Sequence, residues 1–326
     1  MSRPMLSRRA AVAAALAAVA ATPAARAQAA WPARPVRVVV PYPPGGGADT
    51  VSRVLFARLS EDMGQQFVIE NRGGASGTIG AGVVAAAPAD GYTILYDATA
   101  HSVNPFLLPR LPYDTVQAFR PVFLAARVPN LLVVHPSVSD RTVADVVASA
   151  KAARHPLDFA SAGNGTIQHL ALELFALSAG IKLNHVPYRG GGPALNDVMG
   201  GQIKYMFSNA AASIGHVRSG TLRAIAHTGS GRLAALPDVP PVADTLPGFE
   251  AYEWNGVFVP AGTPPEIVAR LNAGLNATLA NAAVRERLVT LAVEAGANTP
   301  EAFGAFVKAE MDKWGRVVRE ANIKLE

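Results

Sequence analysis

Three glycine-rich loops are the segments of this chain whose residue types could bind a small anion. They span residues 45–49, 163–166 and 190–193, and each lies between an expected strand and an expected helix. A helix N-terminus presents unpaired N–H groups and roughly half a positive charge, and glycine lets a ligand approach that backbone closely. Such loops hold a carboxylate or a phosphate without a charged side chain. Any one loop is explained by a tight turn, whereas three together favour a binding cleft.

Four side chains near these loops have two interpretations each. Asp49 lies in the first turn of a helix, where it either interacts with the helix dipole or contacts a ligand donor or the loop itself. Tyr42 and Trp254 either line a pocket or belong to the core. His169 is the one suggestive histidine, and packing or capping is the more ordinary role for it than catalysis.

The signatures of the common enzyme classes are missing from the sequence. There is no Walker A loop, no His-Glu-x-x-His and no Gly-x-Ser-x-Gly. The letters of a dinucleotide fingerprint occur at residues 80–85, but helical spacing of Ile79 and Val83 places those glycines inside a helix. Ser161 and His169 are the nearest approach to a nucleophile and base, and their spacing of eight does not bring them together. We therefore expect no catalytic residue, no metal and no cofactor.

Composition narrows the class further. The chain has 326 residues, of which 50% are hydrophobic and 16% charged, a balance that suits two folded domains and excludes wholesale disorder. It has no cysteine, which excludes disulfides, a thiol nucleophile and cysteine-ligated metal. The formal charge of +5 depends on four arginines in the first 27 residues. Without that segment the net charge is +1, so we expect no nucleic-acid partner.

The first 27 residues have the layout of a secretory signal peptide. A basic start is followed by a short apolar run and by Ala25-Arg26-Ala27, a small-x-small cleavage pattern that leaves Gln28 as the new N-terminus. Ser7-Arg8-Arg9 also resembles a twin-arginine signal, which leaves the export route open. Because no cysteine follows the cleavage site for a lipid anchor, we expect a free periplasmic protein.

The remaining chain alternates expected strands and helices, which predicts βαβ units and a mostly parallel sheet. The first half ends near residues 123–127, a second α/β half restarts after Val128-Pro129-Asn130, and a helical tail packs on the first half. Residues 263–266 give a strong helix start, with Thr263 as its cap. The expected strands are residues 36–40, 67–70, 92–96, 131–134, 157–160, 185–188, 203–207, 222–226 and 254–259.

Several segments together resemble the tripartite tricarboxylate transporter solute receptors, also called Bug proteins. They occur in the family's order along essentially the whole mature chain, and the set is specific although each segment alone is weak. The segments are residues 41–49 (PYPPGGGAD), 70–75 (ENRGGA), 89–93 (ADGYT), 186–190 (VPYRG), 236–240 (LPDVP) and 260–264 (PAGTP).

The resemblance implies an α/β, two-domain periplasmic binding protein type II fold with a cleft between the lobes. Residues 28–126 and 251–326 would form domain 1, and residues 127–250 domain 2. A small organic carboxylate would be held largely by backbone N–H groups and water. Carried over by position, the ligand-binding residues would be Tyr42, Gly46, Gly47, Ala48, Asp49, Ser76, Gly77, Thr78, Thr99, His101, Ser161, Gly165, Thr166, His169, Arg189, Gly190 and Ser208.

Ser208 marks a departure from the family pattern. Many relatives place an aspartate after the strand at residues 205–207, where it can meet a ligand amine, and this chain has Ser208-Asn209. The departure weakens an amino-acid ligand and favours a plain carboxylate or a neutral group, unless the position only caps the next helix.

Three functions compete at this stage. The first is a monomeric receptor that closes on its solute and delivers it to the membrane permease of a tripartite transporter. The second is a sensor that presents the same solute to a partner kinase, which the sequence does not separate from transport. The third and weakest is an exported α/β hydrolase, which would require Ser161 and His169 to meet.

Overall fold

The computed structural model describes residues 31–45, 47–108 and 110–324. The expected signal peptide, Gln28 and Gly46 lie outside these residues. Residues 34–326 form one compact unit, and the described residues before it, 31–33, carry no helix or strand.

One nine-stranded sheet runs through this unit in the order β2-β1-β3-β9-β4-β7-β5-β6, with β8 also paired to β4. The long strand β4 pairs with β9 through its first part and with β7 and β8 through its last part, so it joins two groups of strands. The strands are β1 (Val36–Val40), β2 (Phe67–Asn71), β3 (Thr93–Ala98), β4 (Phe119–Val134), β5 (Leu157–Ser161), β6 (Leu183–Pro187), β7 (Tyr205–Asn209), β8 (Arg223–His227) and β9 (Tyr252–Pro260).

The mixed α/β class is confirmed, but the expected mostly parallel sheet is wrong in its centre. The βαβ units give parallel pairs, β1 with β2 and β3, and β5 with β6 and β7. The strands β4 and β9 are antiparallel to each other and to their outer neighbours. A periodicity argument cannot detect this, because it reads each strand by itself and not its partner.

The strand β4 continues through residues 128–130, after which we expected the second half to restart. Pro129 has no N–H to donate, which normally restricts proline to strand edges and irregular positions. Here the register with β9 ends at Pro129, opposite Tyr252, and the register with β7 begins at Asn130. The proline therefore occupies the residue at which the strand changes neighbours.

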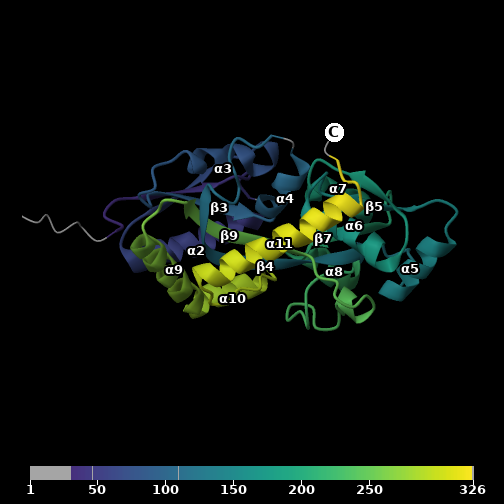
Figure 1. The fold of residues 1–326 in the computed structure, drawn as a ribbon. Helices are drawn as coiled ribbons and strands as arrows, with labels where there is room; N and C mark the ends of the chain where they lie inside the picture. The colour runs from purple at the N-terminus through teal and green to yellow at the C-terminus, as the bar shows by residue number, and fades with distance from the viewer. Residues whose placement is uncertain (1–30, 46, 109, 325–326) are drawn as a thin grey trace, which may run out of the picture. The chain divides into compact units, whose positions relative to one another are not determined.

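Helices pack against the sheet (Figure 1). In α5, Thr142 and Asp145 form the predicted capping box. The cap predicted for α9 is wrong: Pro264 is the N-cap, and the Thr263 hydroxyl donates instead to the Pro260 carbonyl. The helices are α2 (Gly47–Met63), α3 (Thr78–Ala85), α4 (Ala100–Leu107), α5 (Val143–Ala152), α6 (Ile167–Ala179), α7 (Gly191–Met199), α8 (Ala210–Arg218), α9 (Pro265–Ala280), α10 (Ala282–Thr290) and α11 (Pro300–Glu320), with 3-10 turns at Ala75–Gly77 and Val242–Asp244.

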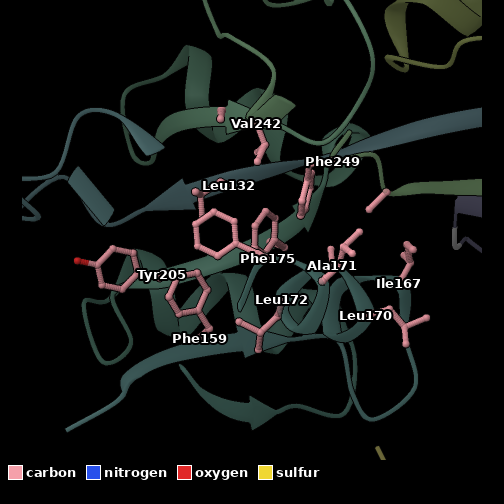
Figure 2. Close-up of a cluster of buried hydrophobic side chains, with 14 of the residues drawn as sticks. Leu132, Phe159, Ile167, Leu170, Ala171, Leu172, Phe175, Tyr205, Val242 and Phe249 are labelled. Carbon is pink, nitrogen blue, oxygen red and sulfur yellow. The ribbon is translucent and has the colours of Figure 1, made fainter. Parts of the chain in front are cut away.

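Two buried apolar clusters hold the sheet and helices together. One packs Trp254, Phe258 and Phe303 against β1 and β3. The other, shown in Figure 2, gathers aromatic and aliphatic side chains such as Phe159 and Phe175 between β4 and α6. Helix α11, yellow in Figure 1, contributes to both clusters, so the helical tail contacts both strand groups and not the first alone.

Candidate functional site

Two cavities share a wall in the middle of the molecule, and Gln168 and Glu253 line both of them. The first measures about 630 Å³ and the second about 190 Å³. Their walls come from the loops after β1, β3, β5 and β6, from the start of α8 and from β9. The loops after β1, β3, β5 and β6 lie at the carboxyl ends of parallel strands, where open α/β sheets bind ligands.

Several helices begin at these walls. The first residues of α2, α4, α6 and α7 line one cavity or the other, as does Ala211 in the first turn of α8. Helices α4 and α7 start without a side-chain cap, so their first N–H groups have no side-chain acceptor from the cap residue. Glu253 is the only Asp, Glu, Lys or Arg among the described lining residues. The site can therefore attract a carboxylate through backbone dipoles, without a basic side chain.

The structure brings six of the sequence-predicted site residues to the cavity walls. Tyr42 and Ser76 come from one strand group and face the loop after β5 across the smaller cavity. The tyrosine hydroxyl donates to Asp97 Oδ1 at 2.8 Å, and burial together with the Asp97 charge raises the pKa of Tyr42 well above its usual range. The six residues are Tyr42, Gly47, Ser76, Thr99, Gly165 and Thr166.

Ten others line neither cavity. His101 is buried, with Nδ1 3.1 Å from Asp97 Oδ2 and its ring stacked on Phe258. Ser208 is buried within β7, and Arg189 is exposed. The ten are Ala48, Asp49, Gly77, Thr78, His101, Ser161, His169, Arg189, Gly190 and Ser208, whereas Gly46 lies outside the described residues.

Asp49 holds the first glycine loop. Its carboxylate accepts hydrogen bonds from the Gly45 amide at 2.9 Å, from Asn71 Nδ2 at 2.9 Å and from two nitrogens of Arg53. Burial alone would raise the pKa of the Asp49 carboxyl, but these hydrogen bonds outweigh burial and lower it. Of its two interpretations, the contact with the loop is the one found.

The buried Ser161 has a histidine partner, but a different one from His169. Ser161 Oγ lies 2.6 Å from His185 Nε2, and the His185 ring stacks on the His169 ring at a centroid distance of 3.7 Å. His169 Nδ1 accepts a hydrogen bond from the Gly165 amide. The stacked histidines therefore contact the loop at residues 163–166 through His169 and the end of β5 through Ser161. Burial and the neighbouring His169 lower the pKa of His185 to about 3.

The lowered pKa of His185 predicts a loss of stability in mild acid. A histidine whose folded pKa is depressed binds its proton more readily in the unfolded chain, so stability falls as the pH drops below about 6.5. Between pH 7.5 and pH 5, the His185→Gln variant should lose several degrees less of its Tm than the wild type does. The matched control is His155→Gln, an exposed histidine, which should follow the wild type. Parallel Tm curves for H185Q and wild type would contradict the prediction.

Sequence reasoning missed the polar wall contributed by β9. Glu253 and Asn255 alternate with the buried Trp254, so the two polar side chains share one face of the strand and line the larger cavity. Asn209 Nδ2 donates to Glu253 Oε2 at 2.9 Å and fixes that carboxylate. The available signal was the pair of polar residues at i and i+2 in an otherwise apolar strand.

Within the described ranges, no cluster of three or more histidine, aspartate or glutamate side chains is arranged to hold a metal ion. None of the helices described is long and apolar enough to cross a bilayer.

Residues 51–323 match the family model described as tripartite tricarboxylate transporter family receptor. The chain belongs to that family. The resemblance drawn from its sequence segments is thereby confirmed, and the family is one of periplasmic solute-binding receptors and not of enzymes.

Two curated relatives align with most of this chain. A UPF0065 protein from the tcbD-tcbE intergenic region of Pseudomonas sp. strain P51 is 40% identical over 284 residues, 86% of this chain and 84% of the relative. BugT of Bordetella pertussis is 36% identical over 294 residues, 89% of this chain and 90% of the relative.

Solved structures of similar receptors confirm the periplasmic binding fold. The R. palustris protein Rpa4515, solved with adipate, is 37% identical with a TM-score of 0.81 and covers 90% of this chain and 100% of its own. MatC from Rhodopseudomonas palustris, solved with malate, is 33% identical with a TM-score of 0.77 and covers 88% and 100%. The periplasmic binding protein BugD is 33% identical with a TM-score of 0.78 and covers 90% and 100%.

Proposed function

We propose that this receptor captures a small organic carboxylate in the periplasm and delivers it to the membrane subunits of a tripartite tricarboxylate-type transporter. The observation that carries the proposal is the convergence of five helix N-termini on two joined cavities that contain no lysine or arginine among their described lining residues. That arrangement suits a carboxylate bound by backbone N–H groups. The adipate and malate in the two R. palustris structures are ligands of this class.

The proposal includes two lobes that close on the ligand as a monomer. Residues 28–126 and 251–326 would form one lobe and residues 127–250 the other. Support comes from the cavity walls, since Gly47 and Tyr42 lie in the first segment while Ala162 and Gly192 lie in the second. The strands β4 and β9 connect the two, so rotation about residues near 127–130 and 250–253 would open and close the site.

Two other functions are weighed against this one. A sensor that presents its solute to a kinase would use the same cavities, and the family supports the transporter partner. A hydrolase is disfavoured because Ser161, the nucleophile it would need, is fully buried, hydrogen-bonded to His185 and absent from both cavity walls. Export would follow from the signal peptide expected at residues 1–27.

The test is a thermal-shift screen against dicarboxylates, tricarboxylates, amino acids, aromatic acids and neutral amides. A ligand at ~100 times its dissociation constant stabilises the folded protein by ~2.7 kcal/mol, which is readily measured. A selective shift with a carboxylate, confirmed by calorimetry, is expected. If no carboxylate shifts a sample freed of copurified ligand by exhaustive dialysis, the proposal fails.

Filling the larger cavity should weaken this binding without unfolding the protein. Gly192 lines that cavity, and a Cβ built on it meets nothing within 4 Å, so Gly192→Leu should place its side chain in open space. We expect ligand affinity to fall by at least ~10-fold, which corresponds to ~1.4 kcal/mol. The matched control is Gly296→Leu, equally unobstructed and away from both cavities. Equal affinity for the two variants would place the ligand elsewhere.

A further inference from the structure

Glu253 presents one carboxylate oxygen to the binding cavities. Its Oε2 is held by Asn209 Nδ2, while Oε1 accepts no hydrogen bond from any described residue. A Cβ built on Gly47 would lie 3.7 Å from Oε1, which places this oxygen beside the first glycine loop. The carboxylate therefore stands among the helix N-termini that would hold a ligand carboxylate.

Asn255 presents a second unsatisfied group two residues along the same strand. It is fully buried and lines the larger cavity, yet neither its Oδ1 nor its Nδ2 has a hydrogen-bond partner among the residues that the structure describes. Buried amides are rarely left in this state, because an unpaired polar group costs free energy. The two side chains offer acceptors at Glu253 Oε1 and Asn255 Oδ1, and a donor at Asn255 Nδ2.

The charge balance decides what can meet these groups. No lysine or arginine lines either cavity among the described residues, so only the helix N-termini would offset the repulsion between Glu253 and a second carboxylate placed near it. Burial also raises the pKa of the Glu253 carboxyl, because desolvation disfavours the anion more than the Asn209 hydrogen bond favours it. A ligand N–H donor would supply both the missing hydrogen and the missing positive charge or dipole.

We infer that the receptor selects a carboxylate whose other end carries an N–H donor, an ammonium or a primary amide, recognised by Glu253 Oε1 and the Asn255 amide. The inference rests on the proposed function, since the ligand's carboxylate is assigned to the helix N-termini. It reverses the expectation drawn from Ser208. That residue is buried in β7 away from the cavities, and its neighbour Asn209 instead holds the Glu253 carboxylate at the site.

Matched ligands test the inference by titration calorimetry. Each linear dicarboxylate of four to six carbons is compared with its ω-amino acid and its monoamide, for example adipate with 6-aminohexanoate and adipic monoamide. With wild-type protein, the better nitrogen-bearing probe of a set should bind at least ~10-fold more tightly than the dicarboxylate, as expected for a hydrogen bond to a charged group. Tighter ammonium or tighter amide binding identifies which of the two donors is native.

Substitutions separate the two polar groups. Glu253→Gln keeps an acceptor oxygen for Asn209 and removes the charge, so it should weaken the ω-amino acid by roughly 10- to 100-fold and spare the monoamide. Asn255→Leu should weaken the monoamide more, because only the amide has a carbonyl oxygen for Asn255 Nδ2. Glu266→Gln, an exposed glutamate with the same change in charge, is the control. Thermal melts verify that each variant is folded.

The outcomes are distinct. If the dicarboxylate binds wild type as tightly as both nitrogen probes, or if E253Q leaves every affinity unchanged, the inference is overturned while the receptor function stands. If none of the probes and no carboxylate of the wider panel binds, the proposed function itself fails and the inference fails with it.

Discussion

Replacing Gly256 with alanine is expected to lower the free energy of unfolding by about 3 kcal/mol, at the upper end for an overpacked core. A Cβ at this position would lie 2.1 Å from Cζ of Phe303, far inside van der Waals contact. Phe303 cannot move aside easily, because it is buried between the Trp254 and Phe258 rings at centroid distances of 5.9 and 5.0 Å. Urea denaturation followed by circular dichroism measures the loss.

A double-mutant cycle shows whether this contact is the cause. Phe303→Leu removes the ring atoms that the new methyl group meets, so adding Gly256→Ala to F303L should cost much less than adding it to wild type. Gly215→Ala is the control, since Gly215 is exposed in α8 and its added Cβ meets nothing, and it should stabilise by about 0.5–1 kcal/mol. A G256A protein as stable as wild type would show that the helix α11 is not seated on β9 as described.

Asp49→Ala is the second large effect, expected to lower the free energy of unfolding by about 2 kcal/mol and to weaken carboxylate binding. The substitution leaves the Gly45 amide without its acceptor and removes one of the two acceptors of Asn71 Nδ2, the other being the Tyr42 carbonyl. Lost partners of a buried charged group cost more than ordinary hydrogen bonds. Because Gly45 and Gly47 line the larger cavity, a loosened loop would also displace the start of α2. Denaturation and calorimetry measure the two effects separately.

The pH dependence of this loss has a definite sign. The folded pKa of Asp49 is lowered, so its stabilisation is present above the unfolded value near 3.8 and disappears as the pH falls through the folded value. The D49A and wild-type stabilities should therefore converge in strong acid. Asp62→Ala is the control, as its carboxylate pairs with Arg58 on the exposed side of the same helix, and it should cost less than about 0.5 kcal/mol. Equal losses for D49A and D62A would contradict the role of Asp49 in the loop.

Much of the fold could be predicted from local sequence. The β-branched run Val36–Val40, the capping box at Thr142 and the glycine loops each depend on residues close together in the chain. Periodicity and capping act over a few residues, so the sequence reveals them directly. The three loops identified as anion-receptive do border the cavities, at Gly45, Gly165 and Gly191.

The predicted site residues divide into those that line the cavities and those that do not. Positions in the loops themselves, such as Gly47 and Thr166, reach the cavity walls, because a loop after a parallel strand faces the carboxyl edge. Positions one or two residues further along, such as His101 and His169, turn inward and support the loops from behind. One residue of displacement reverses the direction of a side chain in a strand and rotates it by about 100° in a helix, which family position alone does not resolve.

The sequence by itself therefore determined the family, the α/β class and the glycine loops that border the cavities. Only the tertiary structure decided that β4 continues through Pro129, that Ser161 meets His185, and that Glu253 and Asn255 face the cavity. These outcomes depend on strands and loops distant in sequence, such as β9 beside β3 and β4, and on which face of each is buried. The pairing of strands that are distant in sequence depends on how the whole sheet is buried, so it cannot be predicted from a short segment of the chain.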